Sequence, residues 1–79
     1  MIYVFGKKDC NSCQITKNLL TDKNIEYQYY DIGEVYEDMA LMKLRNTVKK
    51  QATKEQGPDY PLPLISKEDV LITLNEVIN

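Results

Sequence analysis

Histidine and tryptophan are absent from this 79-residue chain, and cysteine occurs only twice. Without histidine the chain has no imidazole general base and lacks the commonest metal ligand. No apolar run approaches the roughly 20 residues that cross a membrane, and the stretch from Met1 to Gly6 lacks the basic start of a signal peptide. The net charge is -2 with both signs interspersed, so there is no basic field for nucleic acid. These absences predict a cytoplasmic protein that binds neither membranes nor nucleic acid.

The two cysteines are Cys10 and Cys13, separated only by Asn11 and Ser12. Two cysteines are too few for a disulfide scaffold, which needs several pairs in a secreted chain. The length predicts one small domain over residues 1–79, and a hydrophobic fraction of 43% is sufficient for a globular core. The CxxC motif is therefore the main chemical feature of a single domain.

Hydrophobic patterns predict seven elements in the order β-α-β-α-β-β-α. The expected elements are a strand at Ile2–Phe5, a helix from about Asn11 to Lys23, a strand at Ile25–Tyr30, a helix at Glu34–Gln56, strands at Leu62–Ser66 and Val70–Ile72, and a terminal helix after a capping box at Thr73–Glu76. The first strand is continuously apolar, which is typical of a strand buried on both faces. We expect an α/β fold with a four-stranded mixed sheet flanked by helices, the first two strands being parallel.

The two longer helices have apolar stripes. The first helix carries the pairs Ile15/Leu19 and Thr16/Leu20, and Asn24 suits the left-handed conformation at its end. The second helix carries Leu41, Leu44, Val48 and Ala52, with Val35, Met39 and Met42 beside them and Glu34, Glu37 and Asp38 at its start. Its length leaves room for a break near Asn46-Thr47. The lysines of its later turns indicate a solvated face, with partner docking as the alternative.

A cysteine pair at the start of a helix is suited to thiol–disulfide exchange. Unsatisfied N–H groups and the helix dipole stabilise a thiolate at this position and lower its pKa below the free value of about 8.5. We therefore predict that Cys10 is the attacking thiolate and Cys13 the resolving thiol. Lys7 and Lys8 add positive charge nearby, whereas Asp9 opposes them.

Other roles for the cysteine pair are less well supported. A disulfide closing a four-residue loop stabilises by only roughly 2 kcal/mol. A structural zinc site needs four ligands, and the chain offers two cysteines and no histidine. An iron–sulfur cluster shared across a dimer, with the protein as a carrier, remains an alternative. A third alternative is a non-catalytic adaptor that keeps the fold for protein docking.

The chain resembles the glutaredoxins, members of the thioredoxin-fold superfamily. The likeness rests on the segment from Phe5 to Cys13, on Asp31 after the second strand, and on Leu62-Pro63-Leu64-Ile65, which is similar to the family's Val-Pro-x-Val/Ile segment. It implies a cis Pro63 facing the dithiol, and backbone hydrogen bonds from Leu62 to a bound thiol partner. The substrate-binding residues implied by the resemblance are Lys7, Ser12, Leu62, Pro63, Thr73 and Asn75.

Several positions differ from the usual family pattern. Asn11-Ser12 replaces Pro-Tyr between the cysteines, and Ile72-Thr73 stands where the family has Gly-Gly, with Asn75 in place of the following Asp. These changes alter the glutathione pocket but keep the dithiol.

The resemblance implies a monomeric thiol–disulfide oxidoreductase that reduces protein or glutathione mixed disulfides and holds no tightly bound cofactor. Glutathione or a flavoprotein disulfide reductase would supply electrons, and ribonucleotide reductase is a candidate protein substrate, because small redoxins of similar size serve that enzyme.

Overall fold

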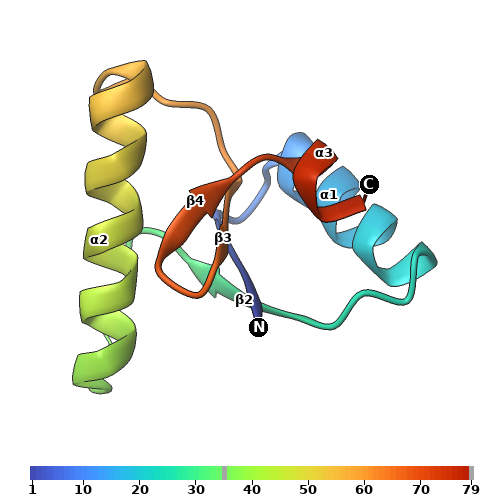
Figure 1. Ribbon diagram of the computed structural model, residues 1–79, viewed down its shortest axis with the longest axis horizontal. Coiled ribbons are helices and arrows are strands. Elements are labelled where there is room, and N and C mark those ends of the chain that lie inside the picture. Colours follow the sequence, from blue (N-terminus) through green and yellow to red (C-terminus); the bar gives the residue numbers. More distant parts are fainter. Residues whose placement is uncertain (35, 79) are drawn as a thin grey trace.

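A four-stranded mixed sheet lies between helices on both of its faces (Figure 1). The computed structural model describes residues 1–34 and 36–78. Its elements are β1 (Ile2–Gly6), α1 (Asn11–Asp22), β2 (Tyr27–Asp31), α2 (Met39–Gln56), β3 (Leu64–Lys67), β4 (Val70–Ile72) and α3 (Leu74–Ile78). The sheet order is β2-β1-β3-β4, with β1 parallel to β2 and antiparallel to β3. The predicted element order and the mixed sheet are confirmed.

The central strand β1 anchors two hydrophobic clusters, one on each face of the sheet. Phe5 is fully buried against Val48 and Ala52 of α2. The preceding residue, Val4, is fully buried on the other face with Leu20 of α1. Because side chains alternate along a strand, a continuous apolar run fills both layers at once. This explains why β1 contains no polar position.

Helix α1 buries one of the two apolar stripes that its sequence predicts. Its buried residues are Cys13, Thr16 and Leu20, so the predicted Thr16/Leu20 pair is confirmed. Ile15 is 59% exposed, so the neighbouring Ile15/Leu19 stripe is turned further from the sheet than the Thr16/Leu20 stripe.

The connection from α1 to β2 is longer than predicted. Asn24 has a φ of 58°, the expected left-handed conformation. The Ile25 N–H donates to the Leu20 carbonyl at 2.9 Å, so Ile25 still closes the end of the helix. The strand consequently begins at Tyr27 instead of Ile25.

Helix α2 begins at Met39, five residues later than the predicted start at Glu34. The Asp38 carboxylate caps it by accepting from the N–H groups of Ala40 and Leu41, at 2.9 and 3.2 Å. Met39 is 82% exposed, so its expected place beside the apolar stripe is also wrong. Val35 lies outside the described residues. The helix continues through Asn46-Thr47 without a break.

The C-terminal part forms a hairpin and a short helix. The third strand begins at Leu64, after both prolines, instead of at the predicted Leu62, because proline has no N–H to give to a ladder. The Gln51 side chain of α2 holds the outer strand: it donates to the Asp69 carbonyl at 2.6 Å and accepts from the Leu71 N–H at 2.8 Å. The predicted capping box is present, with reciprocal bonds between Thr73 and Glu76.

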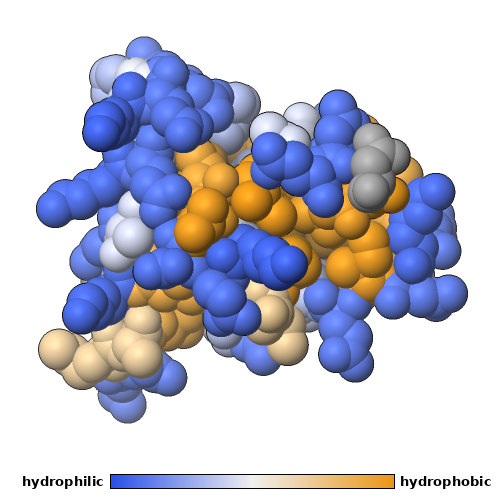
Figure 2. All heavy atoms as spheres, in the orientation of Figure 1, coloured by the Kyte–Doolittle hydropathy of each residue, from blue (hydrophilic) through white to orange (hydrophobic). Residues whose placement is uncertain are grey.

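In Figure 2 most of the outer side of α2 is hydrophilic, its lower end is pale orange, and the strongly apolar atoms show mainly between α2 and the sheet and below α3. Within residues 1–34 and 36–78, no helix has the length and apolar character needed to cross a membrane.

Candidate active site

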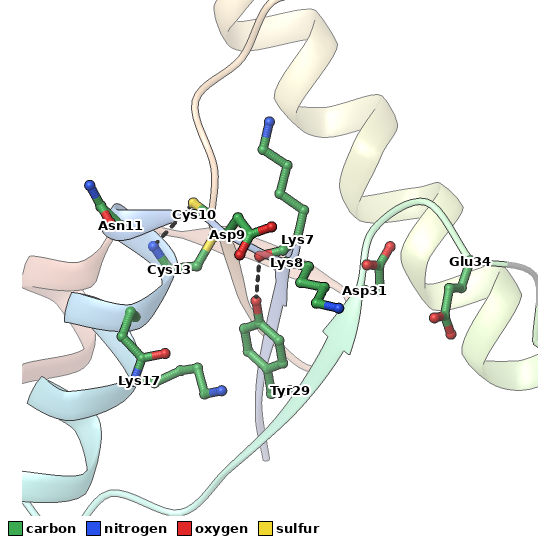
Figure 3. Close-up of a pocket in the computed structure, with 11 residues that line it drawn as sticks. Lys7, Lys8, Asp9, Cys10, Asn11, Cys13, Lys17, Tyr29, Asp31 and Glu34 are labelled. Atoms are coloured by element: carbon green, nitrogen blue, oxygen red, sulfur yellow. Dashed lines mark hydrogen bonds between the residues drawn. The ribbon is translucent and has the colours of Figure 1, made fainter.

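The two cysteines lie at the first turn of α1, immediately after the loop that follows β1 (Figure 3). Cys10 is the N-cap residue, and its Sγ accepts a hydrogen bond from the Cys13 backbone N–H at 3.2 Å. Both thiols are free. Cys10 is half-buried, whereas Cys13 is only 1% exposed. An incoming disulfide therefore meets Cys10 first.

The surroundings shift the two thiol pKa values in opposite directions. A hydrogen bond from the Cys13 side chain is the largest cause lowering the pKa of Cys10, and N–H groups at the helix start and the charge of Lys7 act in the same sense. Burial is the largest cause raising the pKa of Cys13, followed by its hydrogen bond with Cys10. The sulfur of the half-buried Cys10 is thus more readily ionised than that of the buried Cys13.

A pocket of about 550 Å³ opens beside the dithiol. Its lining comes from the β1–α1 loop, the first turns of α1, the end of β2 and the residues after it. The lining residues are Lys7, Lys8, Asp9, Cys10, Asn11, Cys13, Gln14, Lys17, Tyr29, Asp31 and Glu34. Cations and carboxylates both line this pocket, so it can take a ligand with charges of both signs.

Tyr29 is a pocket residue that the sequence did not single out. It lies in β2, and its hydroxyl donates to the Lys7 carbonyl at 3.4 Å. The Lys17 Nζ lies 4.3 Å from the centre of its ring. Burial, followed by the nearby Cys13, raises the pKa of Tyr29 to about 12. The only sequence signal was its position near the end of a strand predicted to be parallel to the one before the CxxC motif.

Gly6 gives Tyr29 and Cys13 room to approach each other. A Cβ at this position would lie 2.5 Å from the Tyr29 Oη and 2.7 Å from the Cys13 Sγ. Both distances are far below ordinary contact. The missing side chain therefore allows both the tyrosine hydroxyl and the buried thiol to pack against the end of β1.

The acidic side of the pocket is fixed by the connection between β2 and α2. The buried Arg45 of α2 donates to the carbonyls of Ile32, at 3.0 Å, and of Glu34. The Tyr36 hydroxyl donates to the Asp31 carbonyl at 2.7 Å. These long-range hydrogen bonds hold the backbone that carries Asp31 and Glu34. No local sequence pattern predicts them.

Leu62 and Pro63 lie outside the pocket lining. The Leu62–Pro63 peptide is cis, as the resemblance implies. Leu64 pairs with Phe5, so Pro63 comes one residue beyond the ladder, level with Gly6 and close to the dithiol end of β1. The Leu62 side chain packs against the cluster on the α2 face.

Three other predicted substrate residues are also absent from the pocket lining. Ser12, Thr73 and Asn75 are exposed. The Thr73 hydroxyl accepts from the Glu76 N–H. Of the predicted site residues, the pocket brings together Lys7, Cys10 and Cys13; the binding roles of the others stay predictions.

Metal-ligating side chains do not gather at the dithiol. Among the residues that the structure describes, no group of three or more His, Cys, Asp or Glu side chains is placed to hold a metal ion.

A cysteine pair that opens the first helix beside the end of a central strand, in a sheet of order β2-β1-β3-β4, defines a dithiol protein of the thioredoxin-like fold. A crystal structure of the glutaredoxin (grx-1) from Archaeoglobus fulgidus has the same fold: it is 17% identical, with a TM-score of 0.55 over 95% of this chain and 78% of that one. No curated protein matches the sequence significantly. The family model for glutaredoxin matches residues 2–58, more than half of the chain. The chain therefore belongs to the glutaredoxin family, a family of thiol–disulfide oxidoreductases.

Proposed function

We propose that the protein reduces disulfides by cycling its own dithiol between Cys10 and Cys13. The observation that carries this proposal is the pairing of a half-buried Cys10 at the helix N-cap, where its pKa is lowered, with a buried Cys13 three residues later. Such a pair has one sulfur ready to attack and a second one ready to resolve.

The reaction has two exchanges. The Cys10 thiolate attacks one sulfur of the substrate disulfide, so that a mixed disulfide forms and the other substrate sulfur leaves as a thiolate. Cys13 then loses its proton and attacks the Cys10 Sγ, forming the Cys10–Cys13 disulfide and releasing the second substrate thiolate. Two electrons pass from the protein to the substrate.

Glutathione and a flavoprotein disulfide reductase are the two proposed sources of electrons. The pocket carries Lys7, Lys8 and Lys17 together with the carboxylates of Asp9, Asp31 and Glu34. Glutathione is a small peptide with two carboxylates and one ammonium group, so its charges suit a lining of mixed sign. Oxidised protein incubated with glutathione and glutathione reductase, or separately with thioredoxin reductase, would distinguish the two by which mixture consumes NADPH.

The substrate is a disulfide-containing protein, with ribonucleotide reductase as the candidate that the family suggests. The protein acts as a monomer in this proposal, since each chain carries both thiols of the cycle. A dithiol that must be returned to its reduced form suits the cytoplasm, where thiols are kept reduced.

The test is a disulfide-reduction assay on single cysteine variants. Cys10→Ser should lose turnover completely, whereas Cys13→Ser should accumulate a mixed disulfide that mass spectrometry detects. Thr21→Ala, an exposed change later on the same helix that leaves both thiols in place, serves as the control. Full turnover by Cys10→Ser would overturn the assignment of Cys10, and full turnover by a variant lacking both cysteines would overturn the proposed function.

A further inference from the structure

We propose that the Tyr29 hydroxyl is the hydrogen-bond donor that stabilises the Cys13 sulfur as a thiolate while Cys13 resolves the mixed disulfide. This inference rests on the proposed dithiol cycle and assigns a third side chain to it. The resolving step has a problem that the first step lacks, because the attacking sulfur is buried and must become charged before it reacts.

The geometry places the donor against the sulfur that needs it. A single point, the position of a Cβ on Gly6, lies within 2.5 Å of the Tyr29 Oη and 2.7 Å of the Cys13 Sγ. The hydroxyl and the thiol are therefore neighbours in a space that only a glycine leaves open. Figure 3 shows the Tyr29 hydroxyl pointing from β2 toward the loop that joins β1 to the cysteines.

The hydroxyl can be redirected at little cost. Its present acceptor, the Lys7 carbonyl, lies at 3.4 Å, which is long for an O–H···O bond, whose usual length is about 2.7–2.8 Å. A thiolate is a charged acceptor and competes well against a distant neutral carbonyl. Rotation about the phenolic C–O bond turns the proton away from the Lys7 oxygen and toward the side on which the Cys13 sulfur lies.

Tyr29 keeps its own proton throughout. Its pKa is raised to about 12, so the phenol is protonated at neutral pH and acts as a donor, not as a base. The proton that leaves Cys13 is taken up by solvent or by the thiolate released in the first exchange. The Cys13 sulfur then forms its bond to Cys10 as the bond from Cys10 to the substrate breaks.

The ring of Tyr29 is held in place from two sides. Its backbone lies in β2, where Tyr29 pairs with the fully buried Val4 of β1. The Lys17 ammonium lies over the ring face at 4.3 Å, a cation–π contact. Lys17 is one turn after Cys13 on α1, so helix and strand fix the hydroxyl relative to the sulfur.

The test uses Tyr29→Phe, which removes the hydroxyl and keeps the ring. Tyr27→Phe is the matched control, because Tyr27 lies two residues earlier on the same face of the same strand, beside Ile2. In a Cys10→Ala background, carbon NMR of the Cys13 Cβ follows its titration directly. We expect Tyr29→Phe to raise the Cys13 pKa, and the fraction of thiolate at neutral pH to fall about tenfold, the usual effect of losing a hydrogen bond to a charged group.

A second readout separates the two exchanges in the chain with both cysteines. Tyr29→Phe should slow release of the mixed disulfide about tenfold in quenched-flow experiments, while the rate at which Cys10 is alkylated stays unchanged. Identical Cys13 titrations in the Tyr29→Phe and Tyr27→Phe proteins would overturn the inference. A wild-type protein that reduces no disulfide would instead overturn the proposed function, and the titration of Cys13 would still report on Tyr29.

Discussion

Cys10 and Cys13 have the same side chain, yet their positions on one helical turn give them different acidities. Cys10 occupies the N-cap, where N–H groups and the Cys13 thiol point at its sulfur, and Cys13 is packed beneath it against Gly6 and Tyr29. Three residues of chain are enough to separate an attacking thiol from a resolving one.

The pH dependence of Cys10 alkylation tests this assignment. Because its pKa is lowered, the Cys10 thiolate fraction should reach one half at a lower pH than in an unperturbed cysteine. Since this folded-state pKa lies below the unfolded one, the Cys10 thiolate stabilises the reduced protein at pH above the unfolded pKa. That contribution is lost as the pH falls through the folded pKa. Alkylation followed by mass spectrometry should give a profile shifted to lower pH than in denaturant, and coincident profiles would contradict the assignment.

Gly6→Ala tests the close packing at the end of β1. The added methyl group would overlap both the Tyr29 Oη and the Cys13 Sγ, so both groups must move. We expect a loss of about 1–3 kcal/mol in the free energy of unfolding, measured by urea titration. Gly33→Ala is the control, because its Cβ would meet only the Asp31 Oδ1 at 3.4 Å. Equal stability of the two variants would show that the space beside Gly6 is not filled as described.

At the scale of the elements, the sequence predicted correctly those helix and strand features that depend on residues close together in the chain. The apolar run of β1, the left-handed Asn24 and the capping box at Thr73 and Glu76 each depend on neighbours within a few residues. The start of α2, in contrast, also depends on a residue further along the chain. Glu34 is an acidic residue of the kind that begins helices. Its carbonyl, however, accepts a hydrogen bond from Arg45 of α2, and Asp38 is the residue that caps the helix.

The same distinction applies to the site. The CxxC motif was visible because its two members are close in sequence, whereas Tyr29 reaches the dithiol only through parallel pairing of β2 with β1. The sequence of α1 likewise offers two adjacent stripes that are both partly apolar, and only the packing against the sheet decides that Thr16 and Leu20 are buried while Ile15 is exposed.

Asp38→Ala tests the observed start of α2. Loss of the carboxylate leaves the N–H groups of Ala40 and Leu41 without their side-chain acceptor. The expected cost is about 1 kcal/mol in the free energy of unfolding, measured by urea titration. Glu37→Ala, which removes the neighbouring carboxylate, is the control and should change stability by less than half as much. A larger effect of Glu37→Ala would place the cap elsewhere.

At the scale of the whole molecule, one sheet contributes residues to two hydrophobic clusters, one on each of its faces. The cluster under α2 is built on Phe5, Val48, Ala52 and Leu64, and the one under α1 and α3 on Val4, Leu20 and Ile65. Because β1 and β3 contribute to both, neither cluster can be lost while the other persists. The protein should therefore unfold in a single transition.

Leu20→Ala and Val48→Ala test this coupling from opposite faces. Leu20→Ala should cost about 2–5 kcal/mol, and Val48→Ala less, because a smaller side chain is truncated. Near-ultraviolet circular dichroism reports on the tyrosines and far-ultraviolet circular dichroism on the helices, and the two signals should change together in both variants. Two separate transitions in either variant would show that the faces fold independently.

The bonds between Gln51 and the outer strand also determine how the sheet ends. A side-chain amide offers the same donor and acceptor as a peptide group, and Gln51 uses both on β4, at Asp69 and Leu71. The Gln51 side-chain amide thus makes the two hydrogen bonds to β4 that a peptide group of a fifth strand would make. A foreign β-strand that pairs along β4 must first displace this amide, so Gln51 protects the protein against edge-to-edge aggregation on that side.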